Sequence, residues 1–157
     1  MSVRVVSEVQ KIDSTINDVY AFLSDFSKIG AMVEMARKMG VEQKIVGLED
    51  KVENVRTTSD TCVCLVKGLG EMGVKIVERE EPKLIKIEGD GSVPFELQMW
   101  IQLLDNGPYD TRMRITLEVN LNMMLKMMLK GKLEKGINQL AEGLSKIPYG
   151  MLRAGAL

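Results

Sequence analysis

The chain has 157 residues, of which 45% are apolar and 27% charged, and its formal net charge is -1. This size and composition predict one globular domain over residues 1–157 and exclude a disordered chain. The near-neutral charge argues against nucleic acid as a partner, because phosphate binding needs a basic face. The absence of histidine excludes Ser–His and Cys–His nucleophile pairs and histidine-ligated metals.

Two cysteines do not make a disulfide framework. The N-terminal segment MSVRVVSEVQKID lacks the apolar core of a signal peptide, and no apolar run approaches transmembrane length. We therefore expect a cytoplasmic protein without stable membrane insertion.

The N-terminal part predicts a strand and then two helices. Residues 3–12 read as a strand, with Val3, Val5 and Val9 on one face. The first helix has Ser14 or Thr15 as its N-cap, and the second is capped by Asp25 and ended by Gly40. The helical apolar positions recur every three or four residues: Ile16, Val19, Tyr20 and Leu23, then Phe26, Ile29, Met32, Val33, Ala36 and Met39.

The middle of the chain changes to a period of two, which is typical of strands with one buried and one solvated face. The candidate strands are residues 43–48, 52–58, 61–67, 74–80, 84–88, 94–104 and 111–121. The clearest alternation predicts that one set of side chains points inward: Phe95, Leu97, Met99, Ile101 and Leu103. Such a pattern predicts an antiparallel sheet.

The C-terminal part returns to helical spacing. Its apolar stripe is Leu125, Leu129, Leu133, Ile137, Leu140 and Leu144. A long antiparallel sheet curls, and one helix cannot fill its concave face, so this order of elements predicts an apolar cavity between sheet and helix.

This layout resembles the START/SRPBCC superfamily, whose helix-grip fold is shared by the major birch-pollen allergen, lipid-transfer START domains and polyketide cyclase/dehydrase-like proteins. The resemblance covers about residues 3–147. Its carriers are VYAFLSDFSKI at 19–29, GVKIVEREEPKLIKIEG at 73–89, FELQMWIQL at 95–103 and the terminal amphipathic helix. It implies an α+β fold, with two short helices after the first strand and a curved antiparallel sheet around a long C-terminal helix. It also implies a cavity for lipids, polyketides or steroids, without shared catalytic residues.

From these patterns we expect the protein to bind or transport a small hydrophobic molecule. The predicted cavity wall is Met32, Val33, Cys62, Cys64, Leu97, Met99, Ile101, Met113, Ile115, Leu117, Leu129, Leu133, Ile137 and Leu140.

Two motifs match part of a known metal or cofactor site, but each lacks other features that the site requires. Residues 68–73 match GxGxxG, yet VKIVERE follows as a strand pattern where a dinucleotide site needs a helix. Cys62 and Cys64 lie on one strand face, but zinc needs about four ligands and no third cysteine exists. We therefore predict no cofactor, no metal site and no catalytic residue of a recognisable type.

Two alternatives to a binding protein remain open. A cyclase- or dehydrase-like enzyme would need a buried acid or base, for which Glu78 or Glu80 are the candidates, with Tyr20, Tyr109 or Ser7 as a polar partner. A protein-interaction module would use the Met-rich start of the last helix. There Met124, Met127 and Met128 lie opposite the apolar stripe.

The Met-rich helix start has several interpretations of its own. We favour contact inside the fold, with the N-terminal helices or the strand crossover. The alternatives are a homodimer contact through Met124, Met127 and Met128, or a lip that touches a membrane. The lysines Lys126, Lys130, Lys132 and Lys135 would fit the membrane alternative.

Overall fold

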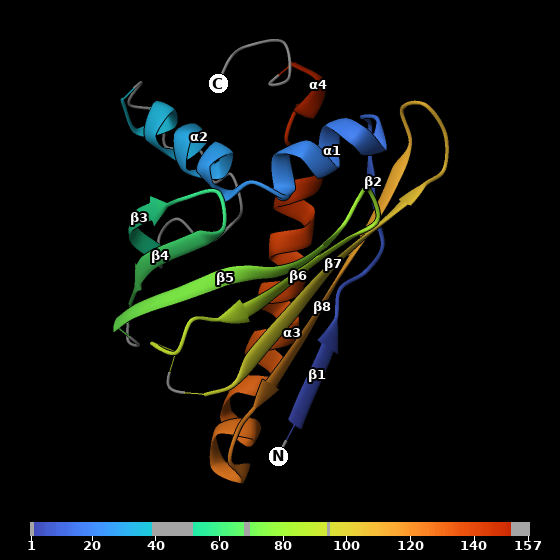
Figure 1. Cartoon of the computed structure of the whole chain (residues 1–157). Coiled ribbons are helices and arrows are strands. Elements are labelled where there is room, and N and C mark those ends of the chain that lie inside the picture. The colour runs from blue at the N-terminus through green and yellow to red at the C-terminus, as the bar shows by residue number, and fades with distance from the viewer. Residues whose placement is uncertain (1, 39–51, 68–69, 94, 152–157) are drawn as a thin grey trace.

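An antiparallel sheet curves around the long C-terminal helix in the computed structural model (Figure 1), which describes residues 2–38, 52–67, 70–93 and 95–151. The strands are β1 (Ser2–Val6), β2 (Gln10–Ile12), β3 (Val52–Thr57), β4 (Thr61–Val66), β5 (Gly70–Glu80), β6 (Leu84–Gly89), β7 (Leu97–Asp105) and β8 (Thr111–Asn120). The helices are α1 (Ile16–Leu23), α2 (Phe26–Lys38), α3 (Met123–Ser145) and the short α4 (Tyr149–Met151). The sheet order is β1-β8-β7-β6-β5-β4-β3, and β2 also pairs with β8. This is the predicted helix-grip arrangement.

The first strand is divided in two at Ser7. The Ser7 N–H donates to the Ile115 carbonyl at 2.8 Å, and the Ser7 hydroxyl accepts from the Ile115 N–H at 2.9 Å. The side chain of Ser7 is buried while Val9 is 60% exposed. The prediction that Val9 shares the inward face of Val3 and Val5 was therefore wrong, because the break at Ser7 changes the alternation.

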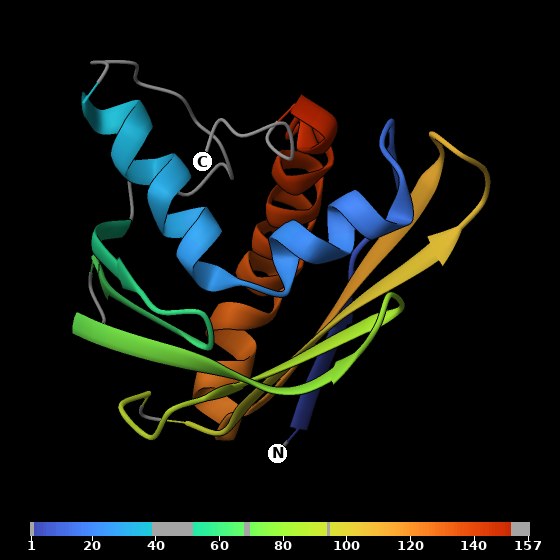
Figure 2. The same ribbon diagram turned by 45° about the horizontal axis from the view of Figure 1, so that its top comes forward.

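The two N-terminal helices begin at side-chain caps. Thr15 caps α1 by accepting from the Asp18 N–H at 3.2 Å, and Asp25 accepts from the Ser27 N–H at 3.0 Å at the start of α2. Arg79 on β5 fixes the junction between them, since its guanidinium donates to the Ser24 carbonyl at 2.9 and 3.0 Å. Both helices are thereby held over one face of the sheet (Figure 2).

The remaining predicted strands are present with shifted ends. The predicted strand at 43–48 and the predicted cap at Gly40 lie outside the described residues. β5 starts at Gly70, whose φ is +86°, and Gly70 pairs with Val66 on β4. The glycine-rich segment thus runs into a strand, as its sequence predicted, and no helix follows it.

The core lies between the sheet and the second half of α3. Ile137, Ala141 and Leu144 of α3 are buried, together with inward side chains of β1, β7 and β8. At the upper end the Phe22 and Tyr149 rings meet edge to face at 5.4 Å, and the Tyr149 hydroxyl donates to the Leu144 carbonyl at 2.7 Å. These contacts anchor the last turns of α3 to α1 and α4.

Candidate binding surface on the concave face

The inner face of the sheet is covered unevenly. α3 packs against β1, β2 and β8 near one edge of the sheet, whereas α2 packs against β3 at the opposite edge. Both helices lie over the same concave face (Figures 1 and 2). Along the apolar stripe of α3, Ile137 and Leu144 are buried, but Leu125, Leu129 and Leu133 are only half-buried. The first half of the stripe therefore keeps accessible apolar surface.

The predicted wall residues divide into two groups. Five are packed into the core, each no more than 6% exposed: Ile101, Met113, Ile115, Leu117 and Ile137. Nine are half-buried: Met32, Val33, Cys62, Cys64, Leu97, Met99, Leu129, Leu133 and Leu140. The second group comes from α2, β4, β7 and α3. Close-packed side chains without accessible surface cannot contact a ligand unless they move, so the second group is the better candidate surface.

Four further half-buried apolar side chains pack beside the same core and were not among the predicted wall residues: Ile29, Val74, Phe95 and Leu125. Strand pairing could have indicated one of them, because Val74 is the cross-strand partner of Cys62. The other three lie on the predicted apolar faces of their elements, and only their tertiary surroundings distinguish them from core residues.

The two half-buried thiols of β4 have raised pKa values, and Cys62 packs beside this core. Burial raises the pKa of Cys62 to about 11, and the neighbouring Cys64 adds to the shift. Burial also raises the pKa of Cys64. Protonated thiols are weak nucleophiles and weak metal ligands, and no metal-binding group of three or more Cys, Asp or Glu occurs among the described residues.

The carboxylates considered for acid–base chemistry lie outside this surface. The register of β5 against β6 shifts between Ile76 and Glu78, and both Glu78 and Glu80 are exposed. The two candidate acids of the enzyme alternative are therefore not buried, because the shift interrupts the alternation that Val74 and Ile76 begin. Of the proposed polar partners, Tyr20 is buried and Tyr109 is 73% exposed.

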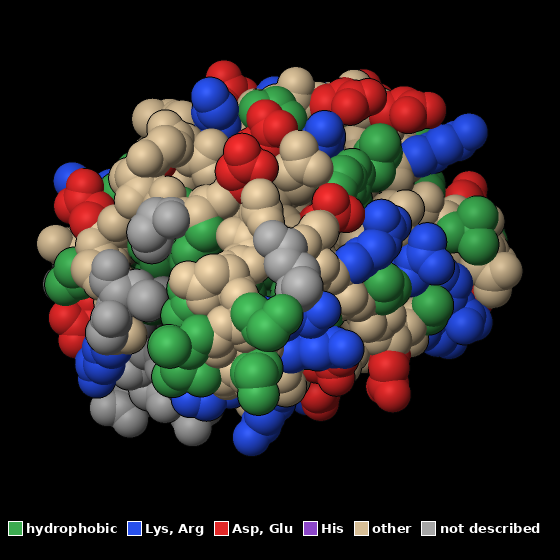
Figure 3. All heavy atoms as spheres, turned by 90° about the horizontal axis from the view of Figure 1, so that it is seen from below, with side chains coloured by type: hydrophobic (Ala, Val, Ile, Leu, Met, Phe, Trp, Pro, Cys, Tyr) green, Lys and Arg blue, Asp and Glu red, His purple; other side chains and the backbone are tan. Residues whose placement is uncertain are grey.

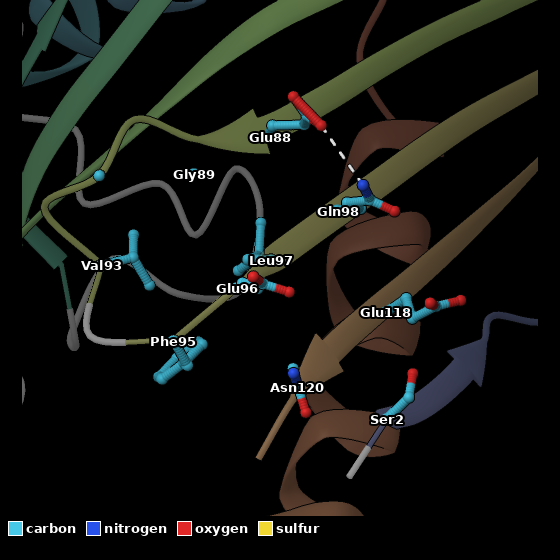
Figure 4. A pocket seen from close by; sticks show the side chains of 11 residues that line it. Ser2, Glu88, Gly89, Val93, Phe95, Glu96, Leu97, Gln98, Glu118 and Asn120 are labelled. Atoms are coloured by element: carbon cyan, nitrogen blue, oxygen red, sulfur yellow. Dashed lines mark hydrogen bonds between the residues drawn. The ribbon is translucent and has the colours of Figure 1, made fainter.

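A separate hollow of about 910 Å³ lies at the end of the sheet, lined by the ends of β1, β6, β7 and β8 and by residues of the segment that joins β6 to β7 (Figure 4). Its lining is largely polar: Ser2, Glu88, Gly89, Gly91, Val93, Phe95, Glu96, Leu97, Gln98, Glu118 and Asn120. Glu88 accepts from Gln98 at 3.3 Å, and Glu118 pairs with Arg4 at 3.5 Å. Only Leu97 belongs to the predicted wall, so this hollow is distinct from the apolar surface.

The Met-rich start of α3 is exposed, contrary to the favoured interpretation. Met123, Met124, Met127 and Met128 are between 62% and 81% exposed. The view from this end of the molecule shows hydrophobic side chains gathered beside lysines and arginines (Figure 3). The interpretation that these methionines contact the N-terminal helices or a strand crossover was therefore wrong. α1 and α2 lie near the opposite end of α3 (Figure 1).

None of the described helices combines the length and hydropathy needed to cross a bilayer.

Comparison with solved structures finds the same fold in proteins of very different sequence. Norcoclaurine synthase from Thalictrum flavum, as a point mutant with a transition-state analogue, aligns with a TM-score of 0.69 at 10% identity over 93% of each chain. A START superfamily protein from Mycobacterium smegmatis aligns with a TM-score of 0.62 at 12% identity, over 98% of this chain and 97% of the other. A conserved protein from Geobacillus kaustophilus aligns with a TM-score of 0.60 at 12% identity over 93% of each chain.

No protein-family model and no curated protein matches the sequence. The structural matches cover nearly the whole chain, and they agree with the curved sheet and the long C-terminal helix described above. The chain therefore has a helix-grip fold of the START/SRPBCC type.

Proposed function

We propose that the protein binds a small hydrophobic molecule, of the lipid, polyketide or sterol kind, on the concave face between α2, β4–β7 and the first half of α3. The observation that carries the proposal is the half-buried state of the inward apolar side chains there. Leu129 and Leu133 on α3 and Met99 on β7 point to the core side of their elements, yet they remain accessible.

The apolar side chains of this surface are incompletely packed. Inward apolar side chains of a folded domain are normally close-packed, and each one left accessible forgoes about 25 cal/mol for every Å² of apolar area. A ligand that covers these side chains would recover part of that energy, less the cost of ordering both partners. The methionines and thiols of the surface are polarizable and adapt to ligands of different shape.

Binding rather than catalysis is the activity that we propose. The interior surface carries thiols with raised pKa values, and the candidate acids Glu78 and Glu80 lie elsewhere. One protein of the same fold is a synthase by name, but at 10% identity its chemistry does not transfer to this chain.

Native mass spectrometry of the purified protein, compared with the mass after denaturing extraction, tests the proposal. We expect a co-purified apolar molecule, or a thermal shift with members of a lipid and polyketide panel. A protein without bound molecule and without any shift would contradict the proposal.

A matched pair of variants on β7 locates the site. Met99→Gln places an amide on the concave face. We expect it to lower the affinity for an apolar ligand by about tenfold, which corresponds roughly to the cost of burying an unpaired polar group. Leu104→Gln is the control, since Leu104 is on the same strand and already 64% exposed. Equal affinities for the two variants would place the ligand elsewhere, for example in the polar hollow near Glu88.

A further inference from the structure

The start of α3 presents an apolar surface to solvent. This methionine patch consists of Met123, Met124, Met127 and Met128, which are 62%, 72%, 81% and 62% exposed. Single exposed hydrophobic residues are ordinary, but four large ones within two turns of a helix form a contiguous patch. The patch has no role in holding the fold, because the core contacts of this segment come from the opposite face, through Leu125 and Leu129.

The segment that carries the patch has charge of one sign, and the first acidic residue after it along the helix is Glu134. The segment from Met123 to Leu133 contains Lys126, Lys130 and Lys132 and no acidic residue. The first turn of α3 likewise holds no acid, although the positive end of the helix dipole favours acids there. Within the described part of the chain, none of these three lysines forms an ion pair. Helix stability therefore does not account for the basic charge.

The lysines border the patch in a regular way. At about 100° per residue, Lys130 and Lys132 fall on the two edges of the methionine face, and both are exposed. An apolar face with long basic side chains on its edges is the arrangement of helices that lie in a membrane interface. There the apolar face enters the headgroup region and the lysine stems extend toward lipid phosphates.

We propose that the methionine patch, with Lys130 and Lys132, docks this end of the molecule on the surface of an anionic lipid bilayer. The same charges disfavour a second copy of the chain as the occupant. A two-fold dimer through this patch would bring the basic side chains of both copies together, with Glu134, just beyond the segment, as the nearest acid along the helix. Docking is peripheral, since no described helix can span the membrane, and it does not depend on the proposed ligand.

Sedimentation with lipid vesicles tests the proposal. The vesicles are phosphatidylcholine alone, or equal parts of phosphatidylcholine and phosphatidylserine. We expect the full chain to sediment with the mixed vesicles, to remain in solution with the neutral ones, and to dissociate as salt is raised. Absence of sedimentation with mixed vesicles at low salt would overturn the proposal.

Two sets of variants identify the surface. Met124→Gln/Met127→Gln/Met128→Gln should abolish sedimentation, whereas Met151→Gln, at a methionine that is also 72% exposed, should leave it unchanged. Lys130→Gln/Lys132→Gln should weaken binding several-fold and flatten its salt dependence. The charge-matched control is Lys28→Gln/Lys146→Gln. Circular dichroism checks that each variant is folded, and the exposure of all substituted methionines favours folding.

Two results would overturn the assignment in favour of another surface or partner. One is equal sedimentation of the triple methionine variant and the unmodified protein. The other is a dimer in size-exclusion chromatography that the triple variant abolishes, without any binding to mixed vesicles, which would make a second copy of the chain the occupant.

Discussion

Ser7 and Ile115 are joined by two hydrogen bonds, one through the backbone of Ser7 and one through its side chain. The Ser7 N–H donates to the Ile115 carbonyl at 2.8 Å, and the Ser7 hydroxyl oxygen accepts from the Ile115 N–H at 2.9 Å. The hydroxyl thus replaces the backbone carbonyl that a continuous strand would offer to Ile115. Because the hydroxyl accepts this hydrogen bond, the chain can leave β1 and resume pairing with β8 as β2.

Replacement of Ser7 by alanine tests that role. Ser7→Ala leaves the Ile115 N–H buried without its acceptor, so we expect a loss of about 1–3 kcal/mol in the free energy of unfolding. Urea denaturation measures the loss, and Ser59→Ala, at an exposed serine, is the control. A change below about 0.5 kcal/mol would show that another acceptor serves Ile115.

The close approach of α2 and β3 gives a second prediction. A Cβ added at Gly30 would collide with the side chain of Thr57. We expect Gly30→Ala to destabilise the fold by about 1–3 kcal/mol through overpacking. Thr57→Ala should recover part of this loss in the double variant, because it removes two of the three colliding atoms. Additive effects in the double-mutant cycle would show that the two residues do not meet.

Two glycines of α3, Gly131 and Gly136, should behave in the opposite way. Nothing lies within 4 Å of a Cβ added at Gly131 or Gly136. Alanine loses less backbone entropy than glycine in a helix, so each substitution should stabilise the protein by about 0.5–1 kcal/mol. Thermal denaturation of Gly131→Ala and Gly136→Ala measures the gain. A lower melting temperature for either variant would indicate that α3 needs flexibility at that position.

The raised pKa of Cys62 predicts that the stability of the fold depends on pH. Burial raises the pKa of Cys62 from 9.0 to about 11, so the folded state holds this proton more tightly than the unfolded chain does. The stability contributed by the proton is complete below about pH 9 and is lost as the pH rises toward 11. Alkylation by iodoacetamide near neutral pH should therefore be much slower for the folded protein than for the unfolded one.

The variant Cys64→Ala isolates Cys62 for this measurement, and mass spectrometry follows the alkylation. A bound apolar molecule should slow alkylation further if Cys62 contributes to the site. Equal rates for folded and unfolded protein would contradict the burial of Cys62.

Periodicity predicted which faces of the elements turn inward, as the β7 side chains Leu97, Met99 and Ile101 show. It failed where one residue interrupts a strand. Val9 was placed on the inner face by counting in twos, and the break at Ser7 turned it outward; the shift after Ile76 likewise leaves Glu78, a candidate buried acid, exposed. Such interruptions depend on the partner strand, which a local pattern does not contain.

The sequence by itself determined the order of helices and strands and the apolar stripe from Leu125 to Leu144, because these follow from local spacing. Only the tertiary structure decided which inward residues are packed and which stay accessible. Leu133 and Ile137 lie one turn apart on the same stripe, but Ile137 is buried and Leu133 is half-buried. The physical reason is that burial depends on what lies opposite, and the distance between α3 and the curved sheet is a property of the whole fold.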